Sequence, residues 1–200
     1  MNTPIDSPRV PEYPIDPLFY QRWSPRAFTD EEIPLGELNA LFEAAHWAPS
    51  SMNAQPWRFI YARRGTPAFA RFVSLLSPRN QEWAGRAAIL VAIVSRNVMN
   101  LPGKDVPVPS PTHSFDAGAA WAHLALQAHL RGWATHGMGG FDRERARAEL
   151  EVPADHTIEA FVAIGRMGDP ATLPEWARAR ELPSGRRPVS EMVREGSFLF

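Results

Sequence analysis

The pattern of apolar and polar positions predicts short helices alternating with a few strands. Apolar residues recur at helical spacing over Leu35–Trp47, and a short helix follows the cap-and-proline pair Thr66-Pro67. The run 88–94, A-I-L-V-A-I-V, is apolar without alternation, which is typical of a central strand covered on both faces. Residues 57–61 and 158–165 are also predicted strands, since both are rich in β-branched or aromatic residues.

The longest predicted helix is capped by Ser114 and covers residues 115–131, ending before Gly132. It is apolar on most sides, which predicts burial in a core or an interface. Small side chains form one stripe that permits close helix approach, at Ala119, Ala122 and Ala125. Weaker signals predict helices from Asp16-Pro17, over 80–86 and after Asp142, a strand near 133–136 and a long proline-rich loop over 96–113.

These elements predict one layered α+β or α/β domain over residues 16–193. Two hundred residues suffice for one sizeable core. Residues 1–15 contain four prolines and are predicted to be an extended arm. Residues 194–200 end in the apolar triplet F-L-F, and exposed apolar clusters usually mark a contact. We therefore expect this tail to pack on a partner subunit.

Composition and charge exclude several classes of function. A formal net charge of −1 argues against a protein that binds nucleic acid through a broad basic surface. The absence of cysteine excludes disulfides and thiolate chemistry, and the histidines show no zinc-ligand spacing, so we expect no metal. No apolar run is long enough to span a membrane, and the first residues lack a signal-peptide core. We therefore expect a cytoplasmic protein without nucleic-acid or membrane partners.

The stretch 48–59, A-P-S-S-M-N-A-Q-P-W-R-F, contains the most informative loop. Pro49, Ser50, Ser51 and Asn53 form turns, yet the segment is longer than a plain helix-to-strand connection. It offers two hydroxyls and two carboxamides in a small space. Such a loop is suited to a polar ligand that needs several hydrogen bonds at fixed positions.

A second candidate is the segment Arg22-Trp23-Ser24-Pro25-Arg26, which follows the first predicted helix. Each arginine taken alone is more often a solvated surface residue. Two arginines flanking a serine in a short loop, however, suit a phosphate group, because the guanidinium fork matches phosphate oxygens.

The sequence resembles the nitroreductase family of flavin enzymes over about residues 16–193. P-S-S-M-N-A-Q-P-W at 49–57 is similar to the family signature P-S-x-x-N-x-Q-P-W, and R-W-S-P-R-A-F at 22–28 resembles its opening motif R-x-S-x-R/K-x-F. Gly137-Met138-Gly139-Gly140 falls where the family has its flavin-ring loop, and Arg186-Arg187-Pro188 where it has a basic C-terminal segment. The resemblance implies an α+β fold with a mainly antiparallel sheet among helices, in an intertwined homodimer.

The resemblance also implies roles for residues. Arg22, Ser24 and Arg186 would hold the phosphate of FMN, and Arg26 would lie near the pyrimidine edge of the flavin. The backbone amide of Gly139 would donate to flavin N5, and the loop at 49–53 would reach the flavin bound by the other subunit. The predicted cofactor-binding residues are Arg22, Trp23, Ser24, Arg26, Pro49, Ser50, Ser51, Asn53, Asn80, Gly137, Met138, Gly139, Gly140, Arg186 and Arg187.

The implied function is FMN-dependent transfer of hydride from NAD(P)H, through flavin N5, to a nitroaromatic, quinone or enone by a ping-pong mechanism. No protein side chain is expected to be catalytic, because the flavin is the reactive group. No G-x-S-x-G elbow, Walker loop or dinucleotide fingerprint is present. The alternatives are other flavin chemistry on the same scaffold, such as flavin cleavage or dehalogenation, and a non-enzymatic flavin-binding protein.

Overall fold

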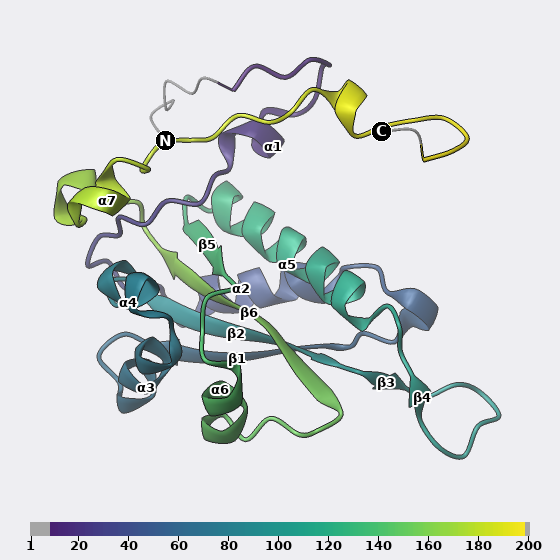
Figure 1. Cartoon of the computed structure of the whole chain (residues 1–200). Coiled ribbons are helices and arrows are strands. Elements are labelled where there is room, and N and C mark those ends of the chain that lie inside the picture. Colours follow the sequence, from purple (N-terminus) through teal and green to yellow (C-terminus); the bar gives the residue numbers. More distant parts are fainter. Residues whose placement is uncertain (1–8, 199–200) are drawn as a thin grey trace.

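The computed structural model describes residues 9–198 and has the α+β fold that the sequence predicts (Figure 1). Its central sheet is antiparallel throughout, in the strand order β1-β2-β6-β5. The strands are β1 (Trp57–Arg63), β2 (Ile89–Arg96), β5 (Ala134–Met138) and β6 (His156–Gly165). Every strand of this sheet is antiparallel to its neighbours. The alternative prediction, an α/β domain with a parallel sheet, is therefore wrong.

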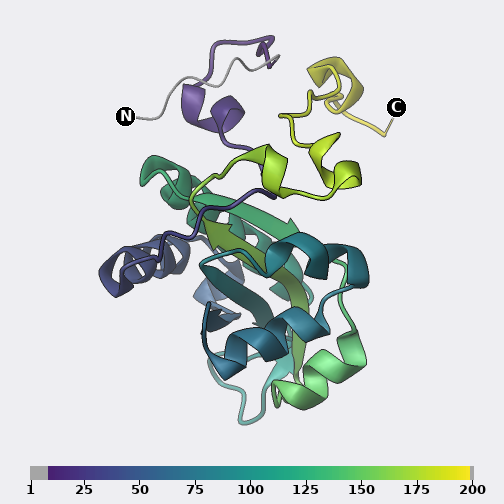
Figure 2. The ribbon, with the colours of Figure 1, turned by 90° about the vertical axis from the view of Figure 1, so that its left-hand side faces the viewer.

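Helices cover both faces of this sheet (Figure 2). On one face lie α2 (Leu35–His46) and α5 (His113–Leu130); on the other lie α3 (Pro67–Leu75), α4 (Pro78–Ala84) and α6 (Arg143–Glu149). Alternate residues of β2 belong to two separate hydrophobic clusters, one on each face. The apolar run at 88–94 is therefore a central strand buried on both faces, as predicted.

The predicted helix caps are confirmed at three sites. Asp16 accepts a hydrogen bond from the amide of Leu18 at the start of α1 (Pro17–Gln21), at 2.8 Å. Thr66 and Asp142 accept equivalent bonds at the starts of α3 and α6. These side chains satisfy amides that the first helical turn leaves unpaired.

Several predicted boundaries differ from the structure. The helix predicted over 80–86 is α4, which begins at Pro78, and α5 begins at His113, with Thr112 rather than Ser114 as its N-cap. β5 continues through Gly137 and Met138, which pair with Val162 and Phe161 of β6. The predicted glycine loop is therefore shorter, because strand pairing extends across its first half.

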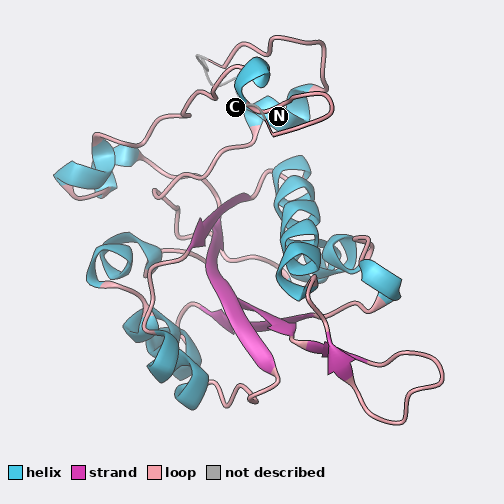
Figure 3. Cartoon of the chain, turned by 45° about the vertical axis from the view of Figure 1, so that its right-hand side comes forward, coloured by secondary structure: helices cyan, strands magenta, loops and turns pink. Residues whose placement is uncertain are grey.

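The segment predicted as one long loop, 96–113, contains a small hairpin. Its strands are β3 (Val98–Met99) and β4 (Val108–Pro109), and the connecting loop extends away from the body of the molecule (Figure 3). The amide of Asn97 donates to the carbonyl of Asp155, which fixes the base of this hairpin beside β6.

The N-terminal and C-terminal segments lie near each other at one end of the molecule (Figure 1). Residues 9–16 contain no helix or strand. The C-terminal part contains η2 (Pro170–Thr172), α7 (Glu175–Arg178) and η3 (Val189–Glu191); η1 (Ser51–Asn53) lies in the earlier loop. Phe198 is 87% exposed, and Leu199, Phe200 and the start of the predicted arm lie outside the described residues.

Helix α5 is buried on one side only within this chain. Ala117, Ala120, Leu124 and Ala128 face the core, whereas Phe115 and Leu130 at its ends are exposed. Of the predicted small stripe, Ala125 is buried and Ala122 is exposed. Within residues 9–198, no helix is long and apolar enough to cross a membrane.

Candidate functional site

The opening loop, residues 22–26, gathers positive charge with the C-terminal segment. Nη1 of Arg22 lies 3.4 Å from Oγ of Ser24. Burial lowers the pKa of Arg22, and the charge of Arg186 lowers it further. Among the described residues, neither arginine has a carboxylate within ion-pair distance. Two repelling guanidinium groups beside a serine hydroxyl form a donor set that fits a phosphate group.

Arg9 belongs to the same cluster, although no sequence motif singled it out. Burial lowers its pKa, and the charges of Arg186 and Arg22 add to the effect. Its Nη1 donates to the carbonyl of Arg22 at 2.8 Å, and its Nε donates to that of Ser184 at 2.7 Å. Arg9 therefore connects the opening loop to the segment that carries Arg186.

Arg187 and Trp23 are less constrained. Arg187 is exposed and has no hydrogen-bond or ion-pair partner within the described part of the chain. Trp23 is half-buried within the opening loop. Arg186 itself bonds to nearby groups of Ser184 and Gly185. Of the two basic residues in this segment, Arg186 is the one whose charge acts on the Arg22 guanidinium.

Arg26 lies in a different electrostatic setting from Arg22. Its guanidinium is 3.6 Å from Oε2 of Glu181, and its backbone amide donates to Oε1 of the same carboxylate at 2.6 Å. The amide of Ala27 donates to that oxygen as well, at 2.8 Å. Nothing in the sequence pattern indicated Glu181, which lies 155 positions further along the chain.

His136, on β5, contacts the opening loop through a hydrogen bond to the carbonyl of Pro25. Burial is the main reason that its pKa falls to about 4, and Arg26 lowers it further, whereas its hydrogen bond to the Pro25 carbonyl raises it. The ring is therefore neutral near pH 7. Nδ1 lies 3.0 Å from the Pro25 oxygen and donates to it, and the ring packs on Trp83 with centroids 4.6 Å apart.

The glycine segment lies next to this histidine in the chain. Gly139 is exposed, and a side chain built there would meet no atom within 4 Å. Gly140 is crowded, because a Cβ there would lie 2.9 Å from Oγ of Ser77. The Met138 side chain is 3% exposed and packs in the core, so only its backbone remains available for a ligand.

Asn80, one of the predicted cofactor-binding residues, lies beside the glycine segment. Its Nδ2 donates to the carbonyl of Gly140 at 3.0 Å, and it comes from α4. This bond gives Asn80 a role in holding the segment in place. The same side chain is only half-buried, so its carboxamide oxygen remains available to a ligand.

The signature loop, residues 49–57, has an unusual backbone. Met52, Asn53 and Gln55 have φ angles of 52°, 52° and 47°, in the left-handed region that L residues other than Asn and Asp rarely adopt. Oγ of Ser50 accepts a hydrogen bond from the amide of Gln55 at 3.0 Å. Pro49 and Asn53 are exposed. The loop therefore holds a strained conformation with polar groups facing outward, a pattern found at binding sites.

A buried carboxylate on α5 fixes this loop. Oδ2 of Asp116 accepts from the amide of Ser51 at 3.2 Å and from the hydroxyl of Thr112 at 3.1 Å. Asp116 is 3% exposed. The signal that could have identified it is its position as a single acid within an apolar helix, because buried carboxylates require hydrogen-bond donors.

The structure divides the predicted residues into two groups at opposite ends of α5. Arg22 lies close enough to His129, in the last turn of α5, to lower the pKa of that histidine, although burial is the larger cause. Ser51 instead bonds to Asp116 in the first turn. At about 1.5 Å per residue, these two turns are about 20 Å apart. The opening loop, Asn80, the glycine segment and the basic C-terminal residues form one group, and the signature loop forms the other.

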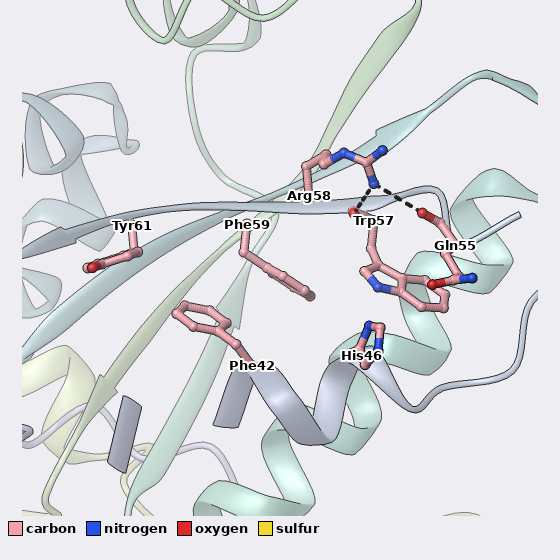
Figure 4. A pocket seen from close by; sticks show the side chains of 7 residues that line it. All are labelled: Phe42, His46, Gln55, Trp57, Arg58, Phe59 and Tyr61. Atoms are coloured by element: carbon pink, nitrogen blue, oxygen red, sulfur yellow. Dashed lines mark hydrogen bonds between the residues drawn. The ribbon is translucent and has the colours of Figure 1, made fainter. Parts of the chain in front are cut away.

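A shallow hollow of about 390 Å³ lies between α2 and the edge strand β1 (Figure 4). Phe42 and Phe59 stack there with ring centroids 5.4 Å apart. The Arg58 guanidinium bonds to the carbonyls of Gln55 and Trp57. The full lining is Phe42, His46, Gln55, Trp57, Arg58, Phe59 and Tyr61. None of the fifteen predicted binding residues lines it, but Gln55 and Trp57 at the end of the signature loop do, so the hollow borders that loop and not the opening group.

One cluster superficially resembles a hydrolase triad. Oγ of Ser95 lies 2.7 Å from Nδ1 of His113 and 2.5 Å from Oε1 of Glu159. Ser95 is fully buried, however, and the histidine nitrogen that it contacts also faces the carboxylate, at 3.4 Å. A nucleophile needs access to substrate and its own histidine nitrogen. Within residues 9–198, there is also no cluster of three potential metal ligands.

The comparisons with known proteins agree on one family. The sequence model of the nitroreductase family matches residues 20–166. An NADH dehydrogenase of Thermus thermophilus is 29% identical, covering 86% of this chain and 91% of the relative. A crystal structure of an oxidoreductase containing FMN is 45% identical with a TM-score of 0.92, covering 100% of this chain and 98% of the other. A candidate nitroreductase from Desulfovibrio desulfuricans in complex with FMN is 25% identical with a TM-score of 0.69, covering 93% of this chain and 100% of the other.

Proposed function

The chain belongs to the nitroreductase family, and from this premise we propose that it is an FMN-dependent oxidoreductase that uses NAD(P)H. When bound, FMN would accept a hydride at N5 as NAD(P)+ leaves, and would pass two electrons to a nitroaromatic, quinone or enone in a second half-reaction. The remaining chemistry is binding and orientation, which this chain's own residues supply.

The opening group holds the cofactor in this proposal. Arg22, Ser24 and Arg186 bind the phosphate, with Arg187 near them at the exposed edge. Arg26 would lie near the pyrimidine end of the ring, and the amide of Gly139 would donate to N5. Asn80 and the backbone around Gly137 and Gly140 complete that side. The observation that carries the proposal is the like-charged Arg22 and Arg186 without a carboxylate partner among the described residues, because a phosphate dianion relieves their repulsion.

The signature loop completes the site of a second copy of the chain. Its distance from the opening group, about 20 Å along α5, leaves Pro49, Ser50, Ser51 and Asn53 without a role at the same flavin. Exposed Phe115 and Leu130 on α5 give such a dimer an apolar surface. Obligate interfaces of this kind commonly bury more than about 2,000 Å². The tail 194–200 packs on the partner in this arrangement.

Two measurements test the proposal. Purified protein should be yellow and contain about one FMN per chain, and it should sediment as a dimer. A colourless protein whose addition does not quench FMN fluorescence in a saturable way contradicts the cofactor assignment. A flavin-loaded monomer at micromolar concentration contradicts the dimer but not the cofactor. Deleting residues 194–200 should weaken both dimerisation and the retention of flavin.

The alternative functions give different results in the same preparation. An oxidoreductase consumes NAD(P)H in proportion to added quinone or nitroaromatic and keeps its FMN intact. A flavin-cleaving enzyme loses FMN absorbance when reduced in air. A non-enzymatic flavin-binding protein oxidises NAD(P)H no faster than free FMN does.

A further inference from the structure

Glu181 is a buried carboxylate with two differently used oxygens. Its side chain is 2% exposed and follows α7, outside every segment that resembles a family motif. Oε1 accepts the backbone amides of Arg26 at 2.6 Å and Ala27 at 2.8 Å. Oε2 is buried and, within residues 9–198, receives no hydrogen bond. The nearest cation to it is Nη1 of Arg26, at 3.6 Å.

The first oxygen fixes where Arg26 lies. Two consecutive amides that donate to one carboxylate oxygen hold the backbone of the opening loop against the C-terminal segment. The Arg26 guanidinium lies 3.5 Å from the carbonyl of Arg180, which precedes Glu181. The loop position that carries the guanidinium is thus determined by a residue from the far end of the chain.

The second oxygen changes how much charge Arg26 presents. The Arg26 side chain is 21% exposed, so the pair lies largely out of water, where charges are screened weakly. The carboxylate therefore offsets part of the guanidinium field. A group on the exposed side of Arg26 therefore experiences a weaker positive potential than an unpaired arginine would produce.

We propose that Glu181 is a positioning residue that sets the redox potential of the bound cofactor through Arg26. This inference rests on the proposed function, in which Arg26 faces the pyrimidine end of FMN. Reduction places negative charge on that end of the ring, so a cation there favours the reduced form. Glu181 holds the cation in place and weakens its field, which keeps the potential lower than Arg26 alone would give.

The experiment compares wild type with Glu181→Gln and Glu181→Asp in the FMN-loaded full chain. Glutamine keeps an oxygen for the two amides but removes the charge, whereas aspartate keeps the charge on a shorter side chain. The measurements are midpoint potential and FMN dissociation constant. Glu149→Gln is the control, because Glu149 also pairs with an arginine, Arg145, but on α6.

In Glu181→Gln, the affinity for reduced FMN should rise about tenfold relative to that for oxidised FMN. This change raises the midpoint potential by about 30 mV, because FMN reduction is a two-electron couple. Glu181→Asp should retain the wild-type potential and lose FMN affinity, and Glu149→Gln should change neither. If Gln and Asp variants both lose FMN without a shift in potential, Glu181 is structural only and the inference is overturned. A lower potential in Glu181→Gln overturns it too.

Three other outcomes also decide the test. If Glu181→Gln does not fold, the equal-length pair Glu181→Asn and Glu181→Asp replaces it, and equal potentials in that pair overturn the inference. If wild-type protein takes up no FMN, the proposed function is wrong and this inference falls with it. If wild type binds FMN normally and the potential of Glu181→Gln is unchanged, only the inference fails.

Discussion

The opening loop and the signature loop are both polar segments of the same chain, but they are held in opposite ways. The opening loop is charged and enclosed: Arg26 bonds to a buried carboxylate, and Phe28, just beyond it, is fully buried. The signature loop is neutral and outward-facing, with Pro49 and Asn53 exposed. At this loop, Oδ2 of the buried Asp116 accepts from the amide of Ser51, and the carbonyl of Pro56 accepts from the amide of Arg96.

The difference indicates which half of the site one chain can assemble alone. Contacts from β5 and the C-terminal segment fix the opening loop before any ligand arrives. The signature loop instead has left-handed φ angles at Met52, Asn53 and Gln55, and it lies at the other end of α5 from the opening group. We infer that the first loop provides most of the affinity for a phosphate, and that the second depends on assembly.

The largest effect is expected from Arg26→Ala. This change leaves the buried Glu181 carboxylate without its counter-ion, which typically costs about 3–5 kcal/mol. The free energy of unfolding should fall by about 3 kcal/mol, near the lower limit, because Arg26 is partly exposed. The measurement is urea denaturation of the FMN-free protein. Adding Glu181→Gln to Arg26→Ala should recover most of the loss; a double variant as unstable as the single one would contradict the pairing.

Acid should weaken the enclosed loop through His136. Its pKa is about 4 in the folded protein against an ordinary value of 6.5. Between pH 6.5 and 4 the unfolded chain binds more protons, so the free energy of unfolding decreases as pH falls through that window, by up to about 3 kcal/mol. Below pH 4 this contribution does not decrease further. Above pH 6.5 it is fully present.

The check is urea denaturation at pH 7 and pH 4.5 for wild type and His136→Asn, whose amide can donate to the Pro25 carbonyl. The stability difference between the two pH values should be smaller in the variant. Acid effects of carboxylates are common to both proteins and cancel in the comparison. An equal pH dependence would show that His136 is not protonated on unfolding in this window.

Arg22→Ala tests the charge of the opening group directly. It removes the proposed charge-assisted hydrogen bond to the phosphate, worth about 1.5–3 kcal/mol, so FMN affinity should fall about tenfold to a hundredfold. Once FMN is saturating, the midpoint potential should not change. Arg187→Ala is the matched control, with a loss below about fivefold, because an exposed charge contributes about 1 kcal/mol or less. Equal losses in both variants would mean that Arg22 is not a direct ligand.

The smallest effect is expected at the signature loop. Asp116→Ala leaves the Ser51 amide without its acceptor and should lower the free energy of unfolding by about 1–2 kcal/mol. Hydrogen exchange at Ser51 should accelerate, while the opening loop stays protected. Asp116→Asn, which keeps an acceptor oxygen, should lose less. If the opening loop loses protection as much as the signature loop, the two regions are not independent.

Much of the fold was predictable because its signals are local. Asp16, Thr66 and Asp142 cap helices through bonds to amides two or three residues away. The apolar run of β2, which lacks alternation, indicates burial on both faces without reference to any distant residue. The boundaries of β5 and the hairpin within 96–113 were predicted wrongly. β5 extends because Gly137 and Met138 pair with β6, and the hairpin forms because β3 pairs with β4; single-sequence periodicity contains no information on such partners.

By itself, the sequence determined the α+β elements, the helix caps and the residue types of the two candidate binding loops. Only the tertiary structure brought Glu181 to Arg26, Asp116 to Ser51 and Arg9 to the segment of Arg186. It also separated the two loops along α5. The physical reason is range: a cap or a turn is decided by neighbours a few residues away, whereas a contact between distant residues exists only after the chain has paid the entropy of closing the loop between them, and the packing of the whole core decides which contacts repay it.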